Sequence, residues 1–220
     1  MPSPTRVYRG VPAAKRQADR RRRLMAAALD LMGSEGWSAT SVRAVCQRAG
    51  LSTRFFYESF PDLDELAVAV FDEELEKVTA RVLSAVAAAT AAAPQDTRSQ
   101  MEAGVRTLVV ELTDDPRLAR LAFVEALGSE PLMRRRLDTM RTYSEIIAGQ
   151  ARAVYGEPPA GGAMFVELTA SVLAGGMAET LIRWLDGGLP MSREELIDDC
   201  VELFVAMCES AVDVAQRRGR

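Results

Sequence analysis

Helix start and stop signals divide nearly the whole chain into segments of helical length. Between these signals apolar residues recur three and four positions apart, and no run alternates apolar and polar residues as a half-buried strand does. Pro94 and Gly187 stand where helices should end, while Asp115-Pro116 and Ser192 with Glu195 are typical helix starts. The sequence therefore predicts an all-α protein of about nine helices.

The helix signals also predict how the chain is organised. A flexible arm over residues 1–12, which holds three prolines, is expected to precede a small helical head over 13–61 and a helical body over 62–220. The hydrophobic content of 48% is sufficient for a sizeable core. We expect helices over residues 13–34, 41–48, 52–58, 62–93, 97–113, 115–127, 130–155, 163–186 and 192–217.

Charge is distributed unevenly between head and body. Residues 1–60 carry 11 Lys and Arg against 4 Asp and Glu, a net charge of +7, whereas the remaining 160 residues carry a net charge of −11. A basic head can attract a polyanion, and an acidic body repels it. The distribution predicts a nucleic-acid partner at the N-terminal end.

The absence of histidine argues against an enzyme and against a metal site. Histidine is the commonest general base and metal ligand, and the chain has none. Cys46, Cys200 and Cys208 have no metal-ligand spacing, and the carboxylates form no recognisable catalytic group. No signal peptide or uncharged membrane span is expected. We therefore expect a cytoplasmic protein without a catalytic residue, metal or cofactor.

Residues 40–57 have the pattern of a helix-turn-helix. Ala49 is small enough for two helices to cross closely, and Gly50 tolerates the positive φ that a sharp turn needs. Val45 and Phe56 are spaced to fix the pair onto the first helix. The same pattern occurs in proteins that do not bind DNA, but the adjacent basic segment favours DNA.

The start of the second short helix is expected to read DNA in the major groove. Arg54 can bond to guanine O6 and N7, and Phe55 can contact a thymine methyl group or merely cover the backbone. Ser52 is expected to cap this helix, and other hydroxyl and basic groups can hold phosphates. The candidate DNA-binding residues are Thr40, Ser41, Arg43, Ser52, Thr53, Arg54, Phe55 and Tyr57.

Residues 20–75 resemble the DNA-binding domain of TetR-type transcriptional regulators. The resemblance rests on Arg23–Met32, Gly36-Trp37, Thr40–Arg43, Ala49–Ser52, Phe56–Pro61 and Glu65-Leu66. It implies a homodimer on a palindromic double-stranded DNA operator, usually a repressor released by a small-molecule effector. Many members have a phosphate-binding lysine at the position of Leu63, so Arg43 or the arm would replace that contact here.

The basic residues near the start of the chain have two interpretations. Arg6, Arg9, Lys15 and Arg16, with the run Arg20–Arg23, can enter a minor groove as homeodomain arms do. Alternatively they form a solvated tail.

The last two expected helices are apolar on more than one face, which predicts burial against both the body and a second copy of the chain. The candidate interface residues are Gly176, Leu181, Trp184, Phe204, Met207 and Ala211.

Middle helices surround a ligand cavity in the family that the chain resembles. The corresponding pocket candidates are Met101, Val105, Phe123, Leu127, Met140, Tyr143, Ile147, Phe165 and Thr169, although ordinary core packing also explains each of them. Because few of these residues are charged, the effector is expected to be largely apolar. The alternative is a DNA-binding regulator without a small ligand, controlled by a protein partner.

Overall fold

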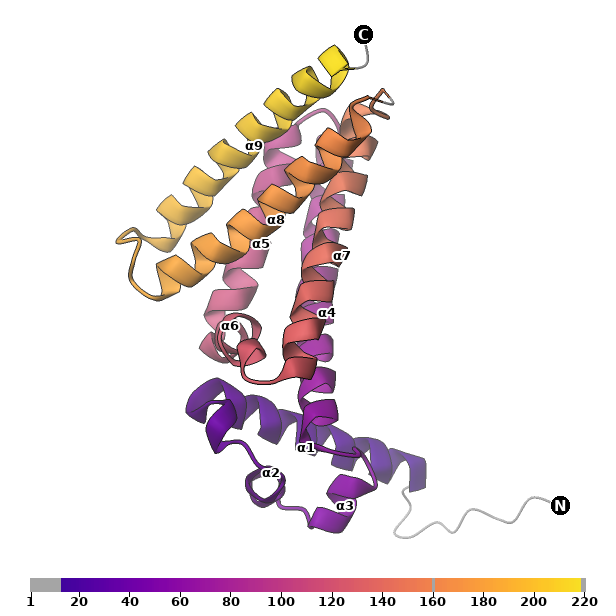
Figure 1. The fold of residues 1–220 in the computed structure, drawn as a ribbon, viewed down its shortest axis with the longest axis vertical. Helices are drawn as coiled ribbons and strands as arrows, with labels where there is room; N and C mark the ends of the chain where they lie inside the picture. Colours follow the sequence, from indigo (N-terminus) through magenta and orange to yellow (C-terminus); the bar gives the residue numbers. More distant parts are fainter. Residues whose placement is uncertain (1–12, 160, 219–220) are drawn as a thin grey trace, which may run out of the picture. The chain divides into compact units, whose positions relative to one another are not determined.

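A computed structural model describes residues 13–159 and 161–218, so the expected arm over residues 1–12 lies outside the described residues. Within the described ranges the protein has nine α-helices, two short 3-10 helices and no strand, which confirms the all-α prediction (Figure 1). The elements are α1 (Ala13–Glu35), η1 (Trp37–Ala39), α2 (Val42–Ala49), α3 (Thr53–Tyr57), α4 (Leu63–Ala92), α5 (Thr97–Asp114), α6 (Pro116–Phe123), η2 (Glu125–Leu127), α7 (Glu130–Tyr155), α8 (Ala163–Leu185) and α9 (Arg193–Arg218).

The contacts divide the chain into two compact units. Unit 1 contains residues up to Leu75 together with Asp115–Arg135, and unit 2 contains Glu76–Asp114 and Arg136–Arg220. These units are defined by contacts and not by function. The expected boundary at residue 61 between a DNA-binding head and a ligand-sensing body therefore stays a prediction.

Unit 1 combines the first three helices with a segment much later in the chain. Helix α1 packs against α2, α3 and α6. Leu24, Met32, Phe56 and Leu66 are fully buried in this unit. At the α1–α6 contact a Cβ on Gly33 would lie only 2.8 Å from the Cα of Arg117, so glycine is what permits the close approach.

Unit 2 contains the two last helices, which lie side by side in opposite directions (Figure 1). Helix α9 packs against both α5 and α8. The α5–α9 contact also carries ion pairs at its surface, including Arg98–Glu202 at 2.5 Å and Arg106–Glu194 at 2.6 Å. Ile197 and Val201 of α9 are buried by this packing.

Most of the expected helix ends are confirmed by their capping bonds. The backbone N–H of Glu65 donates to Asp62 Oδ1 at 2.8 Å, and that of Arg117 donates to Asp115 Oδ1 at 3.0 Å. Ser192 and Glu195 form a reciprocal capping box. The Ser52 expectation was wrong, because its side chain makes no capping bond. The helix expected over 115–127 is also shorter, since α6 ends at Phe123 and η2 follows.

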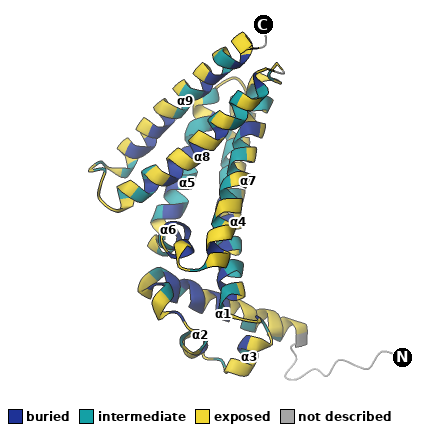
Figure 2. Ribbon diagram, viewed as in Figure 1, coloured by how far each residue is buried: buried dark blue, intermediate teal, exposed yellow. Residues whose placement is uncertain are grey.

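Helix α8 is the one helix among the described residues that is long and apolar enough to cross a membrane by length and composition. Core helices of soluble proteins pass the same test. Only a third of its most apolar stretch is buried within the chain. Figure 2 shows exposed residues along the length of α8, and these include Met164, Leu168 and Val172.

Candidate functional site

The helix-turn-helix forms as the sequence predicts. Gly50 ends α2 in the left-handed conformation with φ 62°, and its N–H donates to the Gln47 carbonyl oxygen at 3.2 Å. Val45 from α2 and Phe56 from α3 are both fully buried. The Phe56 ring also contacts Tyr57 edge-on, with ring centroids 5.3 Å apart. The turn and core therefore fix the direction in which α3 presents its outer side chains.

Arg20, Arg21 and Arg23 of the basic run Arg20–Arg23 reach from α1 to residues at the ends of α2 and α3. The Arg23 guanidinium donates to the Ala49 carbonyl oxygen at 2.6 Å and so caps the end of α2. Arg21 donates to the Ser59 carbonyl oxygen at 3.1 Å, and its guanidinium stacks over a phenylalanine ring. These arginines hold α2 and α3 against α1, a role that neither sequence interpretation included. Arg6 and Arg9 lie outside the described residues.

The outer face of α3 carries the candidate base-reading side chains. Arg54 is 84% exposed, and its Nε donates to Glu58 Oε1 at 3.1 Å. Tyr57 is 61% exposed, and Thr53 is exposed as well. Phe55 is half-buried because the Arg20 guanidinium covers its ring at 4.5 Å. A polyanion approaching this turn would meet a free arginine end, hydroxyl groups and the edge of an aromatic ring.

The start of α2 contributes fewer candidates than expected. Thr40 is buried, and its hydroxyl donates to the Gly36 carbonyl oxygen at 2.9 Å, so it closes the turn rather than facing outward. Ser41 is exposed and its hydroxyl oxygen accepts from the Ala44 N–H at 3.2 Å, which leaves the hydroxyl proton for another acceptor. Arg43 and Ser52 are exposed.

A buried carboxylate also belongs to this unit, and no sequence signal pointed to it. Glu125 is 6% exposed and accepts from the Trp37 backbone N–H at 2.6 Å and from Arg120 Nε at 2.7 Å. Arg120 in turn donates to the Ser34 carbonyl oxygen at 3.2 Å. The carboxylate therefore joins the end of α6 to the turn that leads into α2.

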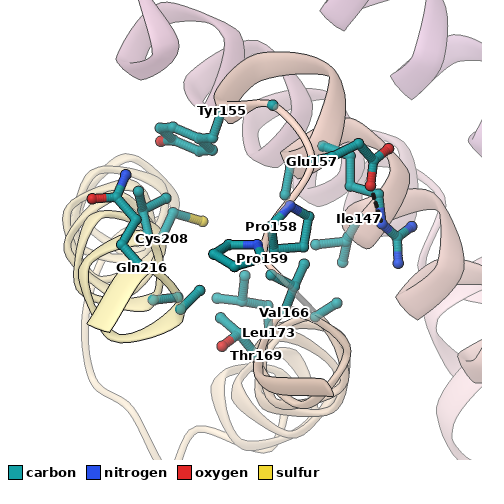
Figure 3. Close-up of a pocket in the computed structure, with 17 residues that line it drawn as sticks. Ile147, Tyr155, Glu157, Pro158, Pro159, Val166, Thr169, Leu173, Cys208 and Gln216 are labelled. Carbon is teal, nitrogen blue, oxygen red and sulfur yellow. Dashed lines mark ion pairs between the residues drawn. The ribbon is translucent and has the colours of Figure 1, made fainter. Parts of the chain in front are cut away.

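A small pocket in unit 2 lies between α7, α8, α9 and the loop 156–159 (Figure 3). Its volume is about 80 Å³ and its lining is mostly apolar. Two predicted residues, Ile147 and Thr169, line it. The Cys208 thiol also faces it, and burial raises the pKa of this thiol, which keeps it in the neutral form.

The polar groups of the pocket are largely engaged by the chain. Thr169 donates its hydroxyl to the Phe165 carbonyl oxygen at 2.8 Å. Arg152 forms an ion pair with Glu167 and lies 3.9 Å from Glu157. Burial raises the pKa of the Tyr155 phenol, which is therefore neutral. The pocket suits an uncharged ligand.

The other predicted pocket residues do not line this pocket. Tyr143 is mostly buried and its hydroxyl bonds with that of Thr79 at 3.1 Å, and burial raises its pKa. Phe165 lies under the Arg218 guanidinium at 4.6 Å. Phe123 and Leu127 belong to unit 1. Met101, Val105 and Met140 are absent from the lining of this pocket.

The candidate interface residues separate into two groups. Leu181 and Ala211 are buried inside the single chain and have almost no surface left for a partner. Gly176 is exposed, and a Cβ built on it would meet nothing within 4 Å. Trp184, Phe204 and Met207 keep intermediate exposure.

Comparison with known proteins gives consistent similarities. Residues 24–70 match the family described as bacterial regulatory proteins, tetR family. The chain is 30% identical over 202 residues to the HTH-type transcriptional regulator BetI of Burkholderia thailandensis, which covers 85% of this chain and 94% of that protein.

Solved structures share the fold at lower identity. The fatty acid degradation regulator FadR from Bacillus halodurans has a TM-score of 0.68 at 15% identity, covering 84% of this chain and 94% of that one. The FadR of Bacillus subtilis in complex with stearoyl-CoA has a TM-score of 0.65 at 16% identity, covering 87% and 97%.

Proposed function

Because the chain belongs to the TetR family of DNA-binding transcriptional regulators, we propose that it is a repressor that binds a palindromic operator as a homodimer and is released by a small, largely apolar effector. We expect the protein to be cytoplasmic, because its operator DNA lies in that compartment. The observation that carries the proposal is the exposed first turn of α3, fixed by a buried Phe56 and braced by arginines of α1.

We assign base reading to Arg54. Its guanidinium is the exposed cation of this turn and matches the paired acceptors of guanine in the major groove. Thr53, Tyr57, Ser41 and Arg43 would bond to phosphates, which fix the register on DNA without reading sequence. Phe55, covered on one face by Arg20, would contact the DNA only with the part of its ring that stays exposed.

We assign dimerisation to the outer faces of α8 and α9. Met164, Leu168 and Val172 are four residues apart, so they form one apolar stripe on α8. A Cβ built on Gly175 or Gly176 would meet no atom of the chain within 4 Å. These glycines would therefore let a partner helix approach closely. A second copy explains this exposed apolar surface better than a lipid bilayer does, since α8 also carries Glu167, Glu179 and Arg183.

The effector would occupy the pocket between α7, α8 and α9. Its apolar lining and internally paired charges favour an uncharged molecule, and its volume of about 80 Å³ is well below the roughly 300–1,000 Å³ of sites for drug-sized ligands. The effector is therefore either small or widens the pocket when it binds. The Cys208 thiol gives a direct test, because an effector in this pocket would slow the reaction of Cys208 with a maleimide, measured by peptide mass spectrometry.

A selection experiment tests the proposed function as a whole. Full-length protein incubated with a randomised duplex pool should enrich an inverted repeat, whose half-site centres lie about one helical turn apart. Light scattering of the free protein should give the mass of two chains. Enrichment of no sequence, or of a single half-site by a monomer, would refute the proposal. Loss of DNA binding only with a protein co-purified from cells would favour control by a protein partner.

A further inference from the structure

Glu58 directly follows α3 and interacts with two arginines. Its Oε1 accepts from Arg54 Nε at 3.1 Å, and its Oε2 lies 3.5 Å from Arg20 Nη2. The Arg20 guanidinium also covers the ring of Phe55 at 4.5 Å. We call these four residues the Glu58 cluster: Arg20, Arg54, Phe55 and Glu58. It links the candidate base-reading arginine to α1.

The hydrogen bond that Arg54 donates to Glu58 determines which edge of the Arg54 guanidinium is left for DNA. Because Nε is engaged, the two terminal nitrogens remain as the edge that can bond to guanine O6 and N7. An arginine side chain that is 84% exposed would otherwise sample many rotamers, and holding it at Nε removes much of that freedom before DNA arrives.

The same carboxylate opposes binding of any phosphate backbone. Glu58 is a negative charge on a segment with a net charge of +7, so it repels a phosphate backbone that the rest of the segment attracts. It therefore lowers affinity for all sequences alike. Only a DNA that engages Arg54 through its terminal nitrogens gains from the orientation that Glu58 gives.

We propose that Glu58 is a positioning residue that sets sequence discrimination, by aiming Arg54 at a guanine and by weakening attachment to non-cognate DNA. This inference rests on the proposed reading of DNA by Arg54. The carboxylate acts through Arg54 and does not contact the base.

The test compares Glu58→Gln with wild type on the duplex selected by the wild-type protein and on a random-sequence duplex. Glu58→Gln should bind the random duplex more tightly, with a steeper salt dependence, because one negative charge near the phosphates is gone. Its preference for the selected base at the Arg54 position should fall about fivefold or more, because a neutral amide oxygen holds Arg54 Nε more weakly than the carboxylate does. A purely structural role would lower affinity for both duplexes and leave that preference intact.

Two further variants make the test specific. In an Arg54→Ala background, Glu58→Gln should change no base preference, while binding to the random duplex should still tighten. The matched control is Glu35→Gln, which removes a carboxylate paired with Arg48 of α2 and should preserve base preference.

Unchanged base preference in Glu58→Gln, or unchanged affinity for the random duplex, would overturn the inference. A wild-type preference that survives in Arg54→Ala would instead overturn the assignment of base reading to Arg54.

Discussion

Replacing Glu125 with alanine should destabilise unit 1 far more than a surface glutamate does. Its carboxylate is buried and accepts two bonds, from the Trp37 N–H at 2.6 Å and from Arg120 Nε at 2.7 Å. Removing it leaves the backbone N–H without this acceptor. It also frees an arginine that is 39% exposed and can turn toward water.

The expected size follows from these two contacts. Each hydrogen bond to a charged group contributes about 1.5–3 kcal/mol to stability. The exposure of Arg120 recovers part of that, so the free energy of unfolding should fall by about 2–3 kcal/mol. Glu125→Gln keeps an acceptor oxygen for Trp37 but loses the ion pair, so it should lose about 1 kcal/mol.

Urea unfolding followed by Trp37 fluorescence measures this loss. The experiment uses a Trp184→Phe background, which leaves Trp37 as the single tryptophan. The control Glu130→Gln removes an exposed pair with Arg134 and should cost less than about 0.5 kcal/mol. If Glu125→Ala is as stable as this control, the buried carboxylate does not hold the turn before α2 and the reasoning fails.

Three other predictions concern Asp115, Gly33 and Gly176. Hydrogen bonds from Arg117 hold the pKa of Asp115 below its usual 3.8. The stability advantage of wild type over Asp115→Asn should therefore be complete at pH 7 and shrink as the pH falls below 3.8, which acid unfolding curves would measure. Gly33→Ala should lower the unfolding free energy by about 1–3 kcal/mol in urea, whereas Gly149→Ala on open α7 surface should raise it slightly. Gly176→Arg should give folded monomers in light scattering, whereas the control Gly149→Arg should remain dimeric. If both variants are dimeric, Gly176 of α8 does not lie in the dimer interface.

The helices were predictable because their signals are local. Caps such as Asp62, Asp115 and Ser192 act on N–H groups within three residues, and Gly50 needs only its own backbone conformation to end α2. The apolar spacing then identifies which face is buried, as at Val45. All nine helices were therefore expected, within a few residues at most ends.

The site was less predictable, because its contacts join distant parts of the chain. Glu125 and Trp37 are 88 residues apart, and nothing in either neighbourhood indicates their bond. The Arg20–Arg23 run reads as a DNA-binding arm until its carbonyl partners are visible. The buried position of Thr40 and the pocket beside Cys208 likewise depend on how whole helices pack.

The most direct test of the central claim is a fluorescence-anisotropy titration of wild type and Arg54→Ala on the selected inverted repeat and on a scrambled duplex. Wild type should bind the repeat far more tightly, with an affinity that falls steeply with salt. Arg54→Ala should lose about 1–3 kcal/mol of binding free energy on the repeat. Its binding to the scrambled duplex, which does not depend on sequence, should weaken much less. If Arg54→Ala binds both duplexes as wild type does, the exposed turn of α3 does not read the operator.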